Sequence, residues 1–135
     1  MPAAGEAEPY LRSKYYTLCD SDNPPEQTKL YLHRPKLRIV KNDSEVIDFL
    51  KKYNFTILDG TEGVREHVRL FRNASIIIGP HGSMFRNMIF SDKNPKVFEF
   101  CAHNRLDHNF ENIGKTMKLD YTWIKQRPTT TLISR

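Results

Sequence analysis

The sequence has little cysteine, no long apolar run and no cluster of basic residues, and each shortage argues against a class of protein. Its two cysteines, Cys19 and Cys101, are too few for a disulfide framework and lack metal-ligand spacing, which leaves a single bridge between them open. No stretch reaches the roughly 18 apolar residues of a membrane span. Residues 1–16 also lack the apolar core of a signal peptide.

The net charge of +5 indicates an anionic partner, because a basic surface attracts phosphate-bearing small molecules, nucleic acid and acidic surfaces alike. The 21 Lys and Arg residues are scattered, however, and never form a run of four. Arginine and aromatic residues do not alternate as they do in RNA-binding modules. A basic nucleic-acid-binding domain is therefore the less favoured interpretation.

A length of 135 residues with 39% hydrophobic content is typical of one globular domain. Residues 1–28 are rich in proline, aspartate and small residues without periodicity, which predicts an irregular N-terminal arm. Residues 126–135 are predicted to form a flexible tail. The folded domain is therefore expected at 29–125.

Within that domain, short apolar runs alternate with amphipathic segments. Strands are predicted at 29–34, 54–60, 75–79, 96–100 and 120–124, and helices at 42–53, 61–74, 83–90 and 109–119. The periodicity places Phe49, Tyr53 and Val64 on the apolar faces of their helices. This alternation predicts an α/β, Rossmann-like fold with a mostly parallel sheet and helices on both faces.

Ligands of open α/β sheets collect at the carboxyl ends of the strands, and the sequence there has one distinctive turn. Gly79 and Gly82 bracket Pro80 and His81, and the helix predicted from Ser83 would point free N–H groups at an anion. The turn therefore predicts a phosphate-binding loop. A plain strand-to-helix turn with a solvent-facing histidine is the alternative.

Five blocks in order resemble glycosyltransferase family 61. They are LYLHR at 30–34, LRIVKNDSEVIDFL at 37–50, IIIGPHGSMFRNMIF at 76–90, KVFEF at 96–100 and FENIGKTMKLDYTWI at 110–124. The resemblance implies a metal-independent, inverting transferase of the GT-B type, which requires no cofactor and uses a nucleotide-diphosphate sugar. A UDP-sugar is the expected donor. This chain resembles the donor-binding second half, so the half that binds the glycan or protein acceptor is expected to be missing.

The resemblance also implies roles for individual residues. Arg34 would bind the diphosphate through its guanidinium, and Gly79 and Gly82 would form the loop around the phosphates. His81 would be the catalytic group, donating to the negative charge that develops on the leaving nucleotide. Glu99 would accept hydrogen bonds from two ribose hydroxyls. The alternatives are an exposed Arg34 at a strand end and a surface Glu99 paired with Lys96 or Arg105.

The remaining candidates follow His81 in the sequence. Ser83 and Arg86 would contribute to the phosphate site, and Asn87 would hold the loop or contact the donor. The family pattern Ala-Gly-Leu-Thr is replaced here by Ser83, Met84, Phe85 and Arg86. Because Met84 replaces a glycine, a catalytically inactive nucleotide-binding or interaction module is the alternative function.

Other polar residues match no motif. His67, His103 and His108 are predicted on solvated faces, and strand alternation places His33 on the side opposite Arg34. Asparagines 42, 54 and 73 each begin an N-glycosylation triplet. These triplets are consistent with the Golgi or ER lumen if the chain is part of a full-length eukaryotic family member.

Overall fold

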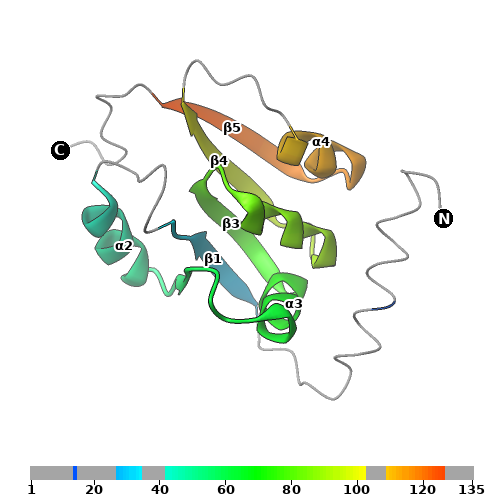
Figure 1. The fold of residues 1–135 in the computed structure, drawn as a ribbon, viewed down its shortest axis with the longest axis horizontal. Helices are drawn as coiled ribbons and strands as arrows, with labels where there is room; N and C mark the ends of the chain where they lie inside the picture. Colours follow the sequence, from blue (N-terminus) through cyan, green and yellow to red (C-terminus); the bar gives the residue numbers. More distant parts are fainter. Residues whose placement is uncertain (1–13, 15–26, 35–41, 103–108, 127–135) are drawn as a thin grey trace.

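Strands and helices alternate along the chain in the computed structural model, which describes residues 14, 27–34, 42–102 and 109–126 (Figure 1). The strands are β1 (Thr28–Leu32), β2 (Thr56–Leu58), β3 (Ala74–Pro80), β4 (Lys96–Ala102) and β5 (Asp120–Gln126). The helices are α2 (Asp43–Lys51), α3 (Val64–Arg72), the 3-10 helix η1 (Ser83–Phe90) and α4 (Asn109–Thr116). Each predicted element of the domain is present, with ends that differ by a few residues.

The five strands form one sheet in the order β2-β1-β3-β4-β5, and every neighbouring pair is parallel. This arrangement confirms the predicted α/β, Rossmann-like fold. The order reverses at β1, which pairs with β2 on one side and with β3 on the other. A crevice forms at such a switch point because the segments that leave the two central strands diverge.

Alternate residues of the strands belong to two separate hydrophobic cores, one on each face of the sheet. Leu30 and Leu32 of β1 join the larger core, whose helical side chains come from α3, η1 and α4. Tyr31 points to the other face and packs against Val46 and Leu50 of α2. The helices therefore cover both faces of the sheet, as the continuous apolar strands require.

Three apolar residues predicted on buried helix faces lie at the surface instead. Val64 is 58% exposed because it begins α3, where the first turn extends past the core. Phe49 and Tyr53 are 43% and 54% exposed, with ring centroids 5.2 Å apart. Helix α2 buries only Val46 and Leu50, so its apolar stripe is narrower than the periodicity predicted.

The predicted arm and tail lie almost entirely outside the described residues, as does Cys19, so the disulfide to Cys101 stays a prediction. Among the residues that the structure does describe, no helix has both the length and the apolar character needed to cross a membrane.

Candidate functional site

A pocket of about 370 Å³ lies at the carboxyl ends of β1, β2 and β3. Its wall combines the end of β1, the turn after β2 and the beginning of η1. The lining residues are Leu32, His33, Arg34, Asp59, Gly60, Thr61, Pro80, Gly82, Ser83, Met84 and Phe85. The sheet reverses its order at this point, so the pocket occupies the position that the fold predicts for a ligand.

The side chain of Arg34 lies along the pocket wall and packs on the backbone of the turn that follows β3. Its guanidinium donates a hydrogen bond of 2.7 Å to the carbonyl oxygen of His81. A Cβ atom on Gly82 would lie 2.6 Å from Cδ of Arg34, which is closer than real Cβ atoms approach. The glycine therefore makes room for the arginine, and the structure places both predicted residues at the pocket.

Gly79 occupies a different environment from Gly82. It lies within β3, in register with Glu99 of β4. A Cβ atom at this position would lie 2.7 Å from the carbonyl oxygen of Leu32 in β1. Gly79 does not line the pocket. Its missing side chain instead allows β1 and β3 to approach.

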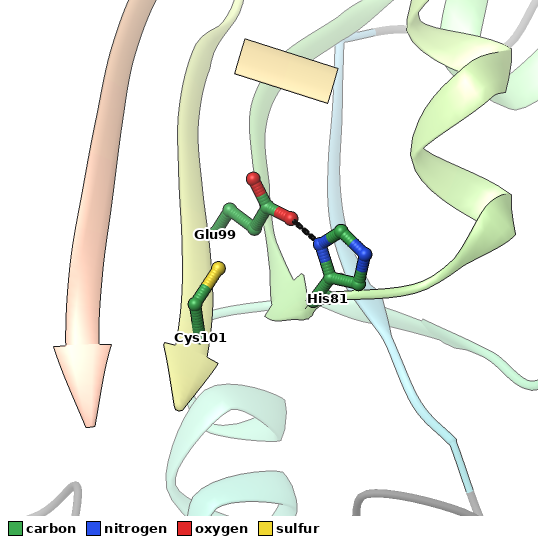
Figure 2. A group of neighbouring side chains, drawn as sticks. All are labelled: His81, Glu99 and Cys101. Atoms are coloured by element: carbon green, nitrogen blue, oxygen red, sulfur yellow. Dashed lines mark hydrogen bonds and ion pairs between the residues drawn. The ribbon is translucent and has the colours of Figure 1, made fainter. Parts of the chain in front are cut away.

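The side chains of His81 and Glu99 point toward each other and form a buried hydrogen-bonded pair (Figure 2), which the half-buried Tyr121 extends into a chain of three. Nδ1 of His81 bonds one carboxylate oxygen of Glu99, and the Tyr121 hydroxyl donates to the other at 2.5 Å. Glu99 is 1% exposed and His81 is 6% exposed. Burial, followed by the hydrogen bond to Glu99, raises the pKa of Tyr121, so its hydroxyl keeps its proton and remains a donor.

His81 and Glu99 lie together near the carboxyl ends of β3 and β4, as the sequence predicted. Neither residue lines the pocket, however. The alternative of a surface Glu99 paired with Lys96 or Arg105 is wrong, because both carboxylate oxygens bond groups inside the protein. The predicted contacts of His81 with the leaving group and of Glu99 with ribose stay predictions. The geometry shows that the backbone oxygen of His81 connects Arg34 to the hydrogen-bonded chain of His81, Glu99 and Tyr121.

Cys101 lies two residues beyond Glu99 on the same face of β4 (Figure 2). One ligand atom from each of His81, Glu99 and Cys101 falls within 4.8 Å of the others, a separation that a metal ion could bridge. The carboxylate, however, is already bonded to His81 and Tyr121, and the indole N–H of Trp123 donates to the Cys101 sulfur. We therefore interpret the group as a hydrogen-bonded network, and metal independence stays an expectation.

A second polar chain connects η1 with the turn after β2. Asn87 Nδ2 lies 3.4 Å from Nδ1 of His67, and Nε2 of His67 lies 2.8 Å from Oε1 of Glu62. Glu62 also accepts hydrogen bonds from the backbone N–H groups of Asp59 and Gly60. The prediction of a solvated His67 is therefore wrong, since its side chain is buried between these partners.

The remaining predicted residues are divided between the pocket and its surroundings. Ser83 lines the pocket where η1 begins, whereas Arg86 is exposed on η1 outside the lining residues. Asn87 is connected through His67 and Glu62 to the turn after β2. Its predicted role of holding the Gly79–Gly82 loop or contacting the donor stays a prediction. The prediction that Arg86 contacts a ligand stays untested by this geometry.

Two residues that were given no binding role also line the pocket. His33 was expected opposite Arg34, but β1 ends at Leu32, so strand alternation no longer separates the two side chains. Asp59 follows β2 directly, and the hydroxyl and N–H of Thr61 lower the pKa of its carboxyl. The sequence feature that indicates a pocket position for both residues is their place immediately after an apolar run.

Comparison with known protein families matches residues 1–98 of the 135 to the sequence model of Glycosyltransferase 61. The matched segment contains every residue that lines the pocket and ends one position before Glu99. No curated protein matches the chain.

Proposed function

The chain belongs to glycosyltransferase family 61, and from this premise we propose that its pocket receives the nucleotide-diphosphate part of a sugar donor. Family membership implies both a sugar donor and an acceptor. The donor we propose is a UDP-sugar, used for inverting transfer to a glycan or protein hydroxyl. Because a two-domain GT-B enzyme does not fit in 135 residues, we propose that a further domain supplies the acceptor site and the catalytic base.

The position of Arg34 is the observation that carries this proposal. The guanidinium has five N–H donors, and the hydrogen bond to His81 holds it at the pocket wall. Two parallel N–H groups match two oxygens of a phosphate, which makes arginine the preferred partner of a diphosphate. His81, Glu99 and Tyr121 support the proposal because they fix the turn to which Arg34 is bonded.

Asp59 and Ser83 complete the proposed site from the other two segments of the wall. A carboxylate with a lowered pKa stays ionised at neutral pH and accepts hydrogen bonds from sugar hydroxyls. Ser83 stands at the amino end of η1, where backbone N–H groups favour an anion. The wall thus offers cationic and N–H groups for the phosphates and one carboxylate for hydroxyl groups.

Calorimetric titration with UDP tests the proposal. Arg34→Ala is expected to weaken UDP binding at least tenfold, because a hydrogen bond to a charged group contributes about 1.5–3 kcal/mol. Arg34→Lys should restore only part of the affinity, since an ammonium cannot donate through a planar fork. Lys96→Ala is the matched control, because this exposed lysine begins β4 at the opposite end of the sheet.

The proposal is wrong if the wild-type chain does not bind UDP saturably, or if Lys96→Ala weakens binding as much as Arg34→Ala does. The second outcome would show that binding depends on overall charge rather than on the pocket.

Met84 favours a second candidate function, a nucleotide-binding module without transferase activity. Its side chain lines the pocket at the position where the family pattern has glycine. With Met84 filling part of the pocket, the space that is left would hold the nucleotide but would keep the sugar out of its productive position. UDP binding without hydrolysis or transfer of any UDP-sugar by the complete gene product, together with activity gained in Met84→Gly, would support this candidate.

A further inference from the structure

We propose that His33 binds the donor diphosphate together with Arg34, and that Asp43 holds the imidazole in place, so that donor affinity depends on pH. This inference deepens the proposed function and rests on it. It gives a role to a histidine that neither the sequence motifs nor the family match assigned.

Three side chains form a connected group at the junction of β1 and α2. Nδ1 of His33 lies 3.0 Å from Oδ2 of Asp43, close enough for an ion pair, although its N–H is off the line of a well-formed hydrogen bond. The hydroxyl of Tyr31 donates a 2.9 Å hydrogen bond to the other oxygen, Oδ1. The backbone N–H of His33 is fixed as well, through a 2.7 Å bond to the carbonyl of Leu58.

Asp43 is held from two sides, which makes it a fixed partner for the imidazole. Burial, followed by the charge of Asp43, raises the pKa of Tyr31, so its hydroxyl stays protonated and continues to donate. The rings of Tyr31 and His33 also stack, with centroids 6.5 Å apart. With Nδ1 directed at the carboxylate, Nε2 is the imidazole nitrogen that can serve a ligand.

The charged groups around His33 favour an anionic ligand next to its ring. Arg34 follows it in the chain and lines the same pocket, while Asp43 pairs with the Nδ1 edge of the ring. Asp59 follows Leu58, the partner of Leu32 on the neighbouring strand, and is the other carboxylate in this set; its Oδ1 accepts two hydrogen bonds from Thr61. A protonated His33 therefore adds its charge on the Arg34 side of the pocket, where a diphosphate would lie.

The pH dependence follows from the chemistry of imidazole. Histidine is the side chain that changes charge between pH 5 and 8, and only its protonated form combines a positive charge with an N–H donor on both ring nitrogens. A charge-assisted hydrogen bond to phosphate is thus lost as the pH rises. A neutral imidazole acting as a base toward an acceptor hydroxyl would require the opposite protonation state.

The test is UDP titration of the wild-type chain and His33→Gln between pH 5.5 and 8. The terminal phosphate of UDP also titrates near pH 6, but it does so for both proteins. The informative quantity is therefore the ratio of their affinities at each pH. We expect the wild type to bind about tenfold more tightly at pH 5.5, with the advantage falling toward unity by pH 8.

Two further variants separate the proposed site from general charge effects. Asp43→Asn should weaken UDP binding at pH 5.5, because the imidazole loses its fixed partner, whereas Lys96→Gln should follow the wild-type profile. Circular dichroism at each pH confirms that the variants are folded. In the wild-type chain, the NMR signals of the His33 ring should move when UDP is added at pH 5.5.

The outcomes distinguish the two levels of the proposal. Absence of UDP binding to the wild type at every pH would overturn the proposed function. Normal UDP binding with a constant affinity ratio for His33→Gln, or with unchanged NMR signals of the His33 ring, would overturn the role of His33 alone. A Lys96→Gln profile that matches that of His33→Gln would overturn it too.

Discussion

Glu99→Ala is expected to lower the free energy of unfolding by about 3–5 kcal/mol, because each buried donor left without its acceptor costs about 1–3 kcal/mol and two donors lose theirs. The change leaves Nδ1 of His81 and the hydroxyl of Tyr121 without their shared acceptor in a region where Glu99 is 1% exposed. It also leaves a cavity beside β5. Urea denaturation followed by circular dichroism measures the loss.

Two milder variants are the controls for this prediction. Glu99→Gln preserves the size of the side chain and an oxygen that can accept from Tyr121, so its cost should be clearly smaller. Tyr121→Phe removes one donor and should cost about 1 kcal/mol. If Glu99→Ala costs no more than Tyr121→Phe, the carboxylate is not the centre of the buried chain, and our description of this network fails.

Gly79→Ala is expected to destabilise the chain by about 3 kcal/mol, at the upper end of the usual cost of overpacking a core. The new methyl group would lie 2.7 Å from the carbonyl oxygen of Leu32 and 2.9 Å from its Cβ atom. Both atoms belong to the neighbouring central strand, so relief requires β1 and β3 to separate. Thermal and urea unfolding should both show the loss.

Gly82→Ala is the matched comparison, because Gly82 lies three residues after Gly79, beyond the end of β3. Its methyl group would meet the Arg34 side chain, with Cδ at 2.6 Å, and a flexible side chain can move aside. We expect a small change in stability but a loss of UDP affinity, since the arginine leaves the wall. Equal destabilisation by the two substitutions would contradict the different environments that we describe.

The fold was largely predictable because the strands are buried on both faces and therefore read as uninterrupted apolar runs. In β3, Ile77 joins the core under α3, η1 and α4, while Ile78 packs on the α2 side. The strand order was not predictable from these runs. The side of β1 on which the next strand pairs depends on which face of the sheet the connecting helix covers. Similar apolar residues suit either face, so the sequence does not decide between them.

The site was predictable where a residue acts from its own turn and unpredictable where a distant partner determines its surroundings. Arg34 reaches the pocket from the end of β1, as the sequence indicated. Glu99 also follows the carboxyl-end rule, yet Tyr121 of β5, 22 residues later, bonds its carboxylate. His67 likewise acquires its environment from Glu62 and Asn87, which the sequence alone does not bring together.

The parallel arrangement of the sheet has a consequence for how the pocket forms during folding. Arg34 and His81 are 47 residues apart, and the segment between them contains α2, β2 and α3. Such nonlocal pairing makes folding slow, because a long loop must close before its contacts stabilise it. The pocket should therefore appear late, and the recovery of UDP binding after dilution from urea should lag behind the recovery of helical signal.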